Sequence, residues 1–557
     1  MRPPQRPDRA ALIERLGKES FDLIVVGGGI TGAWIALDAA MRGLSVGLVE
    51  QGDFASGSSS RSSRFVHGGL RYLRYRHFSL VRESLRERGL LLRLAPHLVR
   101  PSPFLLPVYK DGHNSPLLLK SGLTGYDILA GRLGIGRHQV WSKKHVLREE
   151  PALRTDGLQV GFRYFDAVTN DSRLTLAVLL GAIERGAAAA NYVQALSWEM
   201  ARGRVAAVNC REMTTGEELT VRGRAIISAA GPWTDNLRAM SSASSILRPT
   251  KGVHIVVPRE RLHTESIVAF DWRGRSLFVV PEGRHSYIGT TDTDWQGDPG
   301  GAVASADDVA YLIEAANACF DCALTANDVT ASWAGIRPLV ADEGSPTPSD
   351  VSRDYEILEG TPGVYTICGG KLTSGRSMAE ALVDRVIERE GRHFPPKLAR
   401  CRTSNVLLPG AIADFRRYRK RAIADLVEGW GMPAESAAHL VDAYGTHHVR
   451  ALGAAGRDPA LLAPVSEGLP ELLVEAAHAA AHEMVVTLED FMRRRSDLML
   501  FGAGLDAGAT SRVAGVLAHS LGWDDAEKLR QAEAYERSAA RMMAFRSDVP
   551  EVAPQGR

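Results

Sequence analysis

Near the start of the chain, an unbroken apolar run is followed by glycines and then by a stretch of small residues. Residues 21–26 read FDLIVV, which is typical of a strand buried on both faces. Three glycines follow, and the alanine-rich stretch after them predicts a buried helix to Met41 with a stop at Gly43. A second apolar run ends at Glu50. The pattern therefore predicts a strand, a glycine turn, a helix and a second strand.

The turn of this unit has the spacing Gly27-x-Gly29-x-x-Gly32. In dinucleotide-binding units the first glycine allows the tight turn, the second lets the backbone approach a pyrophosphate, and the third lets helix and strand pack closely. Glu50 follows Gly29 by about 20 residues, where an acid accepts hydrogen bonds from an adenosine ribose and disfavours a 2′-phosphate. These features predict a dinucleotide site, but the motif alone does not separate FAD from NAD.

Four later stretches bear on the choice between FAD and NAD. Residues 58–73, SSSRSSRFVHGGLRYL, place serines and arginines beside a paired glycine. One strand is predicted around Val193, another runs into a turn at Gly231, and a third runs into Gly369-Gly370 and a helix. Together these stretches favour a flavin over a nicotinamide cofactor. The alternative for the serine cluster taken alone is a solvated loop.

Composition narrows the class of protein. At 557 residues the chain is too long for one core, so two or three domains are expected. With 67 Lys and Arg against 65 Asp and Glu, the net charge of +2 gives no basis for nucleic-acid binding. Five cysteines favour a reducing compartment over a disulfide framework. No apolar run approaches the ~20 residues of a membrane-spanning helix, so we expect a cytoplasmic protein, with contact to a membrane surface left open.

Two residue pairs have spacings found in metal sites. Cys319 and Cys322 form a C-x-x-C, and His478 and His482 are four residues apart on a predicted helix. Neither pair has further ligands at a suitable spacing, and packing roles explain both. We therefore expect no metal site.

Seven stretches carry a more specific resemblance, in the same order as in a known family. The chain resembles the aerobic, FAD-dependent glycerol-3-phosphate dehydrogenases, within the glycine/D-amino-acid oxidase-like flavoprotein superfamily. The helical tail, with TLEDFMRRRSDLML, is also similar to that family's C-terminal domain. The matching stretches, from residue 21 to about 390, are DLIVVGGGITGAWIALDAAMRGLSV, SSSRSSRFVHGGLRYL, KGVHIVVP, IGTTDTDW, ASWAGIRPLV, SRDYEI and GGKLTSGRSMAE.

The resemblance implies an α/β fold with a Rossmann-like FAD-binding domain, interleaved with a substrate domain built on a mixed or antiparallel β-sheet, and a C-terminal α-helical domain. The expected division is an N-terminal extension at 1–20, the interleaved FAD and substrate domains at 21–395 with the substrate part mainly at 248–329, a linker at 396–411, the helical domain at 412–545 and a disordered tail at 546–557.

The resemblance also implies how FAD is held, without a covalent bond. The pyrophosphate would lie on the glycine turn, the ribose at the acid that ends the second strand, and the flavin between the serine cluster and the second paired glycine. The implied FAD-binding residues are Gly27, Gly29, Gly32, Glu50, Ser59, Ser60, Ser63, His67, Gly68, Val193, Gly231, Gly370, Lys371, Leu372 and Thr373.

The implied reaction is oxidation of sn-glycerol 3-phosphate to dihydroxyacetone phosphate, by hydride transfer from C2 to FAD, with electrons passed to a membrane quinone. Arginine suits phosphate because its planar fork donates two parallel hydrogen bonds and stays charged. Arg337 lies in an apolar setting, where an anionic partner is expected. For Arg353, an internal salt bridge to Asp354 or Glu356 is an equal alternative. The implied substrate-binding residues are Arg71, Tyr72, Arg337, Arg353 and Lys371.

His254, in KGVHIVVP, is the expected catalytic base because the unperturbed pKa of histidine lies near neutrality. The alternative is a buried core histidine. Arg337 and Lys371 would share the catalytic work by stabilising a developing alkoxide. In GTTDTDW, Thr291 and Asp292 are further site candidates, whereas Asp294 is interpreted as structural.

The chain departs from the family pattern at GGKLTSGR, GLRYLR and YFDAVTNDSR, which bears on the electron acceptor more than on the substrate. Three alternatives stay open: a glycerol-3-phosphate oxidase that uses O₂, another amino-acid or hydroxy-acid flavin oxidase, and a flavin-carrying nucleic-acid-binding protein that docks through basic helices such as residues 416–421. The sequence leaves open which quinone is the acceptor, and also whether the basic patches bind lipid. The oligomeric state is also open, with a homodimer as the expectation.

Overall fold

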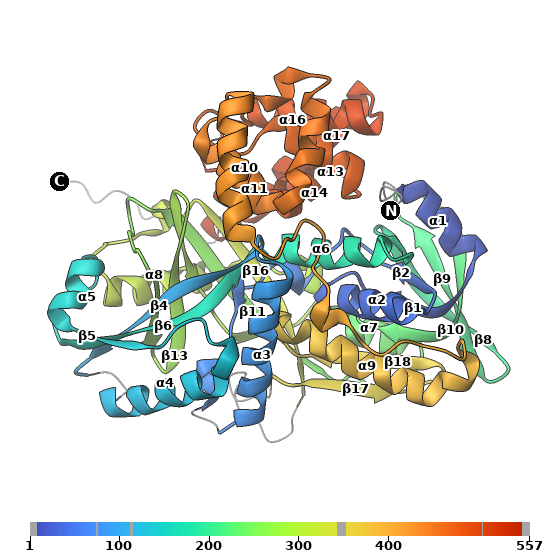
Figure 1. Cartoon of the computed structure of the whole chain (residues 1–557), viewed down its shortest axis with the longest axis horizontal. Coiled ribbons are helices and arrows are strands. Elements are labelled where there is room, and N and C mark those ends of the chain that lie inside the picture. Colours follow the sequence, from blue (N-terminus) through green and yellow to red (C-terminus); the bar gives the residue numbers. More distant parts are fainter. Residues whose placement is uncertain (1–7, 74–75, 112–114, 342–352, 504, 548–557) are drawn as a thin grey trace.

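The computed structural model describes residues 8–73, 76–111, 115–341, 353–503 and 505–547. Two large sheets and a separate group of helices make up these residues (Figure 1). The predicted disordered tail falls for the most part on residues outside the described ranges, as does Arg74 in GLRYLR.

The first sheet carries the predicted strand–turn–helix unit. Its central strands are parallel, in the order β18–β10–β1–β2–β7, and an antiparallel β17 extends it at one edge. A hairpin of β8 and β9 pairs antiparallel with β10. The strands are β1 Ser20–Val26, β2 Val46–Val49, β7 Ala188–Ala190, β8 Val193–Ala201, β9 Arg204–Glu212, β10 Glu218–Ser228, β17 Tyr355–Glu359 and β18 Val364–Gly369.

Helices cover this sheet because its strands are apolar on both faces. Six of the seven residues of β1 are buried, and α2 is buried along almost its whole length, between β1 and its neighbours α6 and α9. Gly43 ends α2 in a left-handed conformation with φ +97°, so the predicted helix and its stop are confirmed. The helices around the sheet are α1 Arg9–Lys18, α2 Ile30–Arg42, α6 Asp171–Ile183, α7 Thr234–Ala239 and α9 Gly375–Glu390.

The second sheet is almost entirely antiparallel, with one parallel pair between β4 and β12. It draws strands from residues 65–169 as well as from 247–340, so this sheet extends beyond the predicted substrate part at 248–329. Its path is β15 Thr293–Asp294, β11 Leu247–Pro258, β14 His285–Gly289, β13 Arg275–Glu282, β12 Ile267–Trp272, β4 Val99–Tyr109, β6 Leu158–Thr169 and β3 Phe65–Val66, with β16 Ala331–Val340 paired to β11 and β5 Gln139–Ser142 paired to β6.

Four helices flank the second sheet: α3 Phe78–Leu94, α4 Pro116–Ala130, α5 Lys143–Glu149 and α8 Ala306–Cys319. The last of these, α8, lies between β15 and β16 in the sequence. A hydrophobic cluster lies on each face of the sheet, so both faces are covered. The α/β fold with a mixed substrate sheet is therefore confirmed.

The helical domain lies to one side of both sheets (Figure 1, orange to red) and has two hydrophobic clusters of its own. Between α9 and α10, residues 396–411 contain one short 3-10 turn, Thr403–Asn405. The helices of the domain are α10 Phe415–Trp430, α11 Ala434–Tyr444, α12 His448–Ala455, α13 Leu473–His482, α14 Leu488–Asp490, α15 Leu498–Phe501, α16 Ala509–Leu521 and α17 Asp525–Arg541.

Candidate active site

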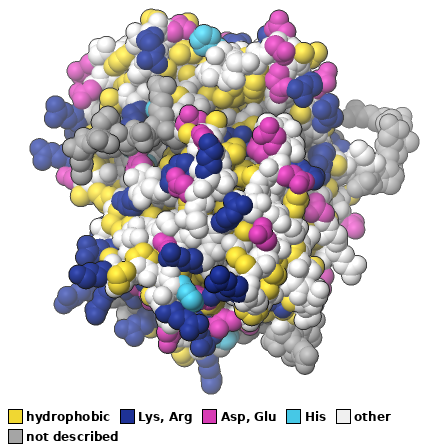
Figure 2. All heavy atoms as spheres, turned by 90° about the vertical axis from the view of Figure 1, so that its right-hand side faces the viewer, with side chains coloured by type: hydrophobic (Ala, Val, Ile, Leu, Met, Phe, Trp, Pro, Cys, Tyr) yellow, Lys and Arg dark blue, Asp and Glu magenta, His cyan; other side chains and the backbone are white. Residues whose placement is uncertain are grey.

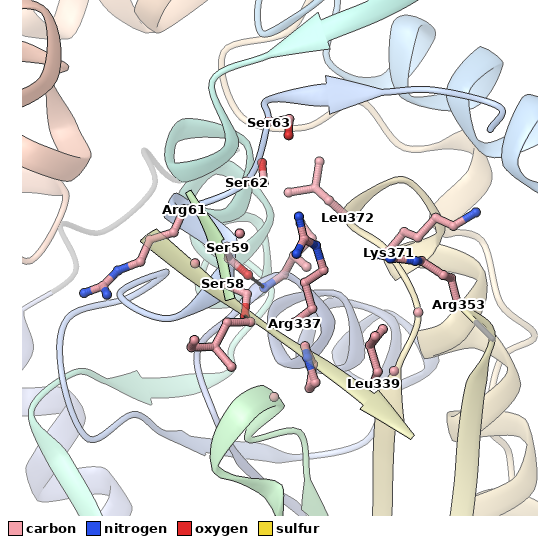
Figure 3. A pocket seen from close by; sticks show the side chains of 18 of the residues that line it. Ser58, Ser59, Arg61, Ser62, Ser63, Arg337, Leu339, Arg353, Lys371 and Leu372 are labelled. Atoms are coloured by element: carbon pink, nitrogen blue, oxygen red, sulfur yellow. Dashed lines mark hydrogen bonds between the residues drawn. The ribbon is translucent and has the colours of Figure 1, made fainter. Parts of the chain in front are cut away.

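A cavity of about 930 Å³ runs from the glycine turn after β1 to strands β11 and β16 of the second sheet. Most of the predicted site residues line it, and Figure 3 shows part of the wall. Three do not, namely Gly32, Ser60 and Gly68, which lie just behind the lining. The predicted residues that line it are Gly27, Gly29, Glu50, Ser59, Ser63, His67, Arg71, Tyr72, Val193, Gly231, His254, Thr291, Asp292, Arg337, Arg353, Gly370, Lys371, Leu372 and Thr373.

The glycine turn admits backbone only. Gly27 has φ +118°, and a Cβ there would lie 2.5 Å from the carbonyl oxygen of Ala229. A Cβ on Gly32 would lie 1.9 Å from the carbonyl oxygen of Gly27, so Gly32 acts through packing. Gly29 precedes α2 directly. The N-terminus of α2 therefore opens onto the cavity with its N–H groups and positive dipole end, a suitable site for a pyrophosphate.

Glu50 is held in place by two backbone amides. Its Oε2 accepts a hydrogen bond from Gly28 N at 2.6 Å and its Oε1 accepts one from Gly52 N at 2.9 Å. Burial raises the pKa of Glu50, and these two amides oppose the rise. The carboxylate lies beside the glycine turn and lines the cavity, so the residues present fit the ribose of a bound dinucleotide.

The serine cluster is tied to neighbouring elements and is not a solvated loop. Ser59 Oγ accepts from Ile30 N at 2.9 Å, Ser58 Oγ donates to Ile336 O at 2.5 Å, and Ser62 Oγ donates to Asp171 at 2.7 Å. Ser60 is buried outside the cavity. These bonds connect the serine cluster to α2, β16 and α6, and they hold a polar wall along the cavity.

A second turn, His67-Gly68-Gly69, aims Arg71 and Tyr72 toward the cavity. Gly68 N donates to Tyr126 Oη at 2.9 Å and to Asp166 at 3.3 Å, and Arg88 donates to the same carboxylate at 2.7 Å. Gly68 therefore acts as an anchor for the turn. Sequence reasoning missed this buried Tyr126–Asp166–Arg88 group because its members come from three separate elements.

Asp292 joins the two arginines at the far end of the cavity. Arg337 Nη1 donates to Asp292 Oδ1 at 2.9 Å and Arg353 Nη2 donates to Oδ2 at 3.1 Å. Burial acts to raise the pKa of Asp292, but Arg337 and Arg353 outweigh it and hold that pKa below its ordinary value. Burial lowers the pKa of Arg337 to about 10 although Asp292 opposes the change. The carboxylate that meets Arg353 here is thus distant in sequence, unlike Asp354 and Glu356.

Lys371 is the cation beside this pair without a hydrogen-bond partner among the residues described. Its Nζ is buried and lies 3.9 Å from the centroid of the Tyr72 ring. Burial, with Arg353 nearby, lowers the pKa of Lys371 to about 7. Figure 3 shows Lys371 next to Arg353, with Arg337 between them and the serine cluster. An unpartnered buried cation indicates a site for an anionic ligand.

His254 lies on β11 with its ring enclosed. The ring stacks on Trp333 at a centroid distance of 4.6 Å, and its Nε2 shares a hydrogen bond of 2.8 Å with Ser63 Oγ. Nδ1 is buried without a partner among the described residues. Burial, with the charges of Arg337 and Arg64, lowers the pKa of His254 to about 3. The imidazole is therefore neutral at physiological pH.

Comparison with known proteins identifies the family. A family model described as FAD dependent oxidoreductase matches residues 22–385, and a model of the C-terminal domain of alpha-glycerophosphate oxidase matches residues 401–528. Glycerol-3-phosphate dehydrogenase 2 of Mycobacterium tuberculosis is 38% identical over 95% of this chain and 89% of its own length. The chain belongs to the FAD-dependent glycerol-3-phosphate dehydrogenases.

Further family members agree over nearly the whole chain. The aerobic glycerol-3-phosphate dehydrogenase of Staphylococcus haemolyticus is 36% identical over 89% of this chain and 90% of its own length. The crystal structure of a Bacillus halodurans glycerol-3-phosphate dehydrogenase in complex with FAD aligns with a TM-score of 0.80 at 32% identity, covering 97% of this chain and 98% of that chain. FAD is accordingly the cofactor of this dehydrogenase family member.

One departure from the family pattern has a visible packing reason. A Cβ on Gly375, in GGKLTSGR, would lie 3.1 Å from the Trp34 ring and 3.2 Å from the Ile30 side chain. Gly375 opens α9 and Trp34 lies in α2. A bulky residue at position 375 would force these two helices apart beside the nucleotide turn.

His67 is a second imidazole of the cavity, assigned from sequence to flavin binding alone. Its ring makes no hydrogen bond to any residue within the described ranges. Burial, and then the charges of Lys371 and Arg71, lower its pKa to about 3. It therefore lies among the substrate-side cations as a neutral ring. The only sequence signal for this position is the HGG turn, which does not reveal what surrounds it.

The structure describes the remaining sequence candidates as well. Thr291 Oγ accepts from Val253 N at 3.0 Å, and Asp294 pairs with Arg248 at an exposed strand edge. Within the described ranges, no group of three or more His, Cys, Asp and Glu side chains could hold a metal ion. In the same residues, no helix combines the length and the apolar character needed to cross a bilayer.

Proposed function

We propose that this FAD-dependent family member oxidises sn-glycerol 3-phosphate to dihydroxyacetone phosphate and passes the electrons to a membrane quinone, from the cytoplasmic side of the membrane. One observation carries the substrate assignment. The cavity that begins at the dinucleotide turn ends at three half-buried cations, Arg337, Arg353 and Lys371, with Asp292 as the carboxylate between the arginines. That excess of positive charge suits a small phosphate ester.

The cations differ in how they would bind the phosphate. Asp292 orients the forks of Arg337 and Arg353, which can then donate charge-assisted hydrogen bonds to phosphate oxygens. Lys371 is a point charge without a competing partner among the described residues. Arg71 and Tyr72 lie beside it, with the Arg71 guanidinium 5.9 Å from the Tyr72 ring centroid. Glycerol, which lacks the phosphate, should bind far more weakly.

Bound FAD supplies the acceptor for the hydride that leaves C2. The protein must remove the proton of the C2 hydroxyl, a step to which a positioned base contributes about 10²–10⁴-fold. We assign this base to His254, because its neutral ring has Nε2 paired with the cavity-lining Ser63 hydroxyl. Arg337 and Lys371 would stabilise the developing negative charge on the oxygen.

His67 is the alternative base, since its ring lies among the cations and has no competing hydrogen bond to a described residue. Single-turnover reduction of the flavin, recorded anaerobically in His254→Gln and His67→Gln, separates the two assignments. Loss of the chemical step by about 10²-fold or more in His254→Gln, with a small effect in His67→Gln, supports the first. The reverse pattern would move the assignment to His67.

The acceptor proposal rests on helix α4 at the rim of the cavity. Leu118, Leu119 and Gly122 line the cavity, while Leu117 and Ile128 on the same helix are 73% and 74% exposed. By contrast, the face drawn in Figure 2 mixes charged and scattered hydrophobic side chains, with Lys and Arg gathered at its lower left. An exposed apolar helix beside the site suits a lipid-soluble acceptor and contact with a membrane surface.

The first experiment is anaerobic addition of sn-glycerol 3-phosphate to the purified yellow protein while the visible flavin absorbance is recorded. Rapid bleaching that glycerol does not produce supports the proposal, and no bleaching with FAD bound would overturn the substrate assignment. Reoxidation is then compared between air and a quinone analogue in liposomes. Faster return of colour in air, with one peroxide per substrate, would select the oxidase. The homodimer remains a prediction, and light scattering of the purified protein would test it by measuring the molecular mass in solution.

A further inference from the structure

A short segment of the helical domain reaches across to the loop that precedes the flavin side of the cavity. We name residues 490–497 the clamp segment and residues 51–64 the flavin loop. The cavity-lining residues extend no further along the sequence than Met378, so the described part of the helical domain lies behind the wall. The clamp segment nevertheless contacts the flavin loop at three separate points.

Two consecutive arginines hold the start of the loop. Arg494 Nε donates to Asp53 Oδ2 at 2.5 Å, and Arg495 donates to the same oxygen. Asp53 is 1% exposed and follows Glu50 by three residues. Burial acts to raise the pKa of Asp53, but Arg495 and Arg494 outweigh it and hold that pKa below its ordinary value. The carboxylate is therefore charged and fully engaged by the clamp segment.

The middle and the end of the loop are held by the neighbouring residues of the same segment. Arg493 Nη2 donates to the carbonyl oxygen of Ser60 at 2.6 Å. Asp497 accepts two hydrogen bonds from Arg64, at 2.8 and 2.5 Å. Arg64 has φ +61°, in the left-handed region that non-glycine residues adopt at a cost. Ser63, which precedes it, is the residue that meets His254.

The clamp segment also contacts the start of β8, where the adenine contact is expected. Asp490 Oδ1 accepts hydrogen bonds from Tyr192 Oη and from Arg494 Nη2, both at 2.7 Å. Tyr192 N in turn donates to the carbonyl oxygen of Gly52 at the beginning of the flavin loop. The same few residues thus connect the helical domain with both the ribose end and the flavin end of the expected cofactor position.

The clamp is an unusual way to join two domains if stability is its sole purpose. Arg493, Arg494 and Arg495 are all buried, at 3–7% exposure, and the Nη1 atom of Arg493 has no partner among the described residues. Burial, with Arg64 nearby, lowers the pKa of Arg493 to about 9. Buried charges are expensive, and apolar residues of similar size often stabilise a joint as well or better. What ionic contacts add is a defined geometry of the loop.

We propose that the clamp segment is a positioning element for FAD: it holds the flavin loop in the conformation that binds the cofactor. Docking of the helical domain and binding of FAD are then coupled, and each strengthens the other by the same factor. The proposal concerns the cofactor and not the substrate, so it stands or falls independently of the reaction assigned above.

The test compares variants of the full-length protein in their affinity for FAD, measured by titrating the apoprotein and following flavin fluorescence. Arg493→Met removes the hydrogen bond to Ser60 and should weaken FAD binding by about tenfold, which corresponds to about 1.4 kcal/mol. Arg493→Lys should restore most of the affinity, because an ammonium group can also donate to that carbonyl. Arg512→Met, which removes an arginine bound to Val465 O and Asp506 within the helical domain, is the matched control.

A second measurement does not depend on the stability of any variant. In the wild-type apoprotein, added FAD should slow amide hydrogen exchange in residues 486–501, which do not line the cavity, and this protection should be lost in Arg493→Met. The proposal is overturned if Arg493→Met and Asp497→Asn bind FAD within about twofold of wild type, the limit of ordinary additivity, while their melting temperatures fall. It is equally overturned if FAD leaves the exchange of residues 486–501 unchanged in the wild type.

Discussion

The two ends of the cavity offer different groups to a bound anion. At the nucleotide end, glycine backbone and the N-terminus of α2 form the wall. Among the residues from Gly27 to Glu50, none contributes a cation to the cavity lining. At the substrate end, the cavity is lined by the basic side chains of Arg337, Arg353 and Lys371, and Asp292 balances part of their charge. A cofactor that stays bound is held by dipoles and shape, whereas a small substrate that must enter and leave is held by ionic groups.

The nucleotide end should be the more sensitive to added volume. Gly32→Val places side-chain atoms where the Gly27 carbonyl oxygen lies, since even a Cβ would be 1.9 Å from it. Because backbone cannot move away as a flexible side chain does, we expect the protein to lose its FAD. The ratio of visible to ultraviolet absorbance after purification measures this. Gly125→Ala, on a helix with no atom within 4 Å of the new Cβ, should keep the flavin. A yellow Gly32→Val protein would contradict the packing role of this glycine.

The substrate end should instead tolerate volume and depend on charge. Arg337→Ala should keep FAD but lower kcat/KM for sn-glycerol 3-phosphate by about 10²–10³-fold, through loss of charge-assisted hydrogen bonds. Steady-state kinetics with a quinone analogue measure the effect. Arg248→Ala is the control. Arg248 lies on β11, the strand that carries His254, and pairs with Asp294, but it does not line the cavity. An equal loss in both variants would show that Arg337 acts through the sheet and not on the substrate.

A substitution of Asp292 tests how the carboxylate that bridges the two arginines affects anion binding at the substrate end. Asp292→Asn removes the negative charge between Arg337 and Arg353. We expect inorganic phosphate to become a tighter competitive inhibitor, while kcat falls by about tenfold because the guanidinium forks are no longer oriented. Inhibition and turnover assays on the same preparation separate the two effects. Weaker phosphate inhibition would show the opposite balance: the carboxylate then helps anion binding by orienting the arginines more than its negative charge opposes that binding.

The smallest expected effect is the pH dependence of Lys371. Its pKa of about 7 means that it is charged below neutral pH and loses its charge as the pH rises. Substrate affinity should therefore decrease by a few fold between about pH 6 and pH 8.5, measured as the substrate concentration that half-saturates the rate of anaerobic flavin reduction. Lys371→Arg, whose guanidinium stays charged, should flatten this dependence. An unchanged pH profile in Lys371→Arg would assign the titration to another group.

The dinucleotide unit could be predicted from sequence because its determinants are local. Gly27, Gly29, Gly32 and Glu50 lie within 24 consecutive residues, and their spacing follows from the geometry of one strand, one turn and one helix. The boundaries of β1 and α2 agree with the prediction for the same reason. Ser60 and Gly68 do not line the cavity, which the sequence could not reveal because burial behind a wall depends on what packs against its far side.

The substrate end illustrates the opposite case. The resemblance indicated Arg337, Arg353 and Lys371 as substrate-binding residues. It did not indicate that Asp292 joins the two arginines, because Asp292, Arg337 and Arg353 come from separate stretches of the chain. The environment of His254 and His67 was also hidden, because the sequence does not record which nitrogen is enclosed, paired or exposed to the cavity. The clamp segment, more than 420 residues from the loop that it holds, had no signal beyond three consecutive arginines.

By itself the sequence determined the strand–turn–helix unit of a dinucleotide site, because patterns of apolar residues and glycines constrain backbone conformation directly. The fold class, FAD and the family came from the resemblance of its motifs to a known family. Tertiary structure decided which charges pair, which imidazoles stay neutral and which domain holds the flavin loop. The physical reason is that ionic and proton-transfer energies depend on distance and burial. Those two quantities exist only after distant segments have packed together.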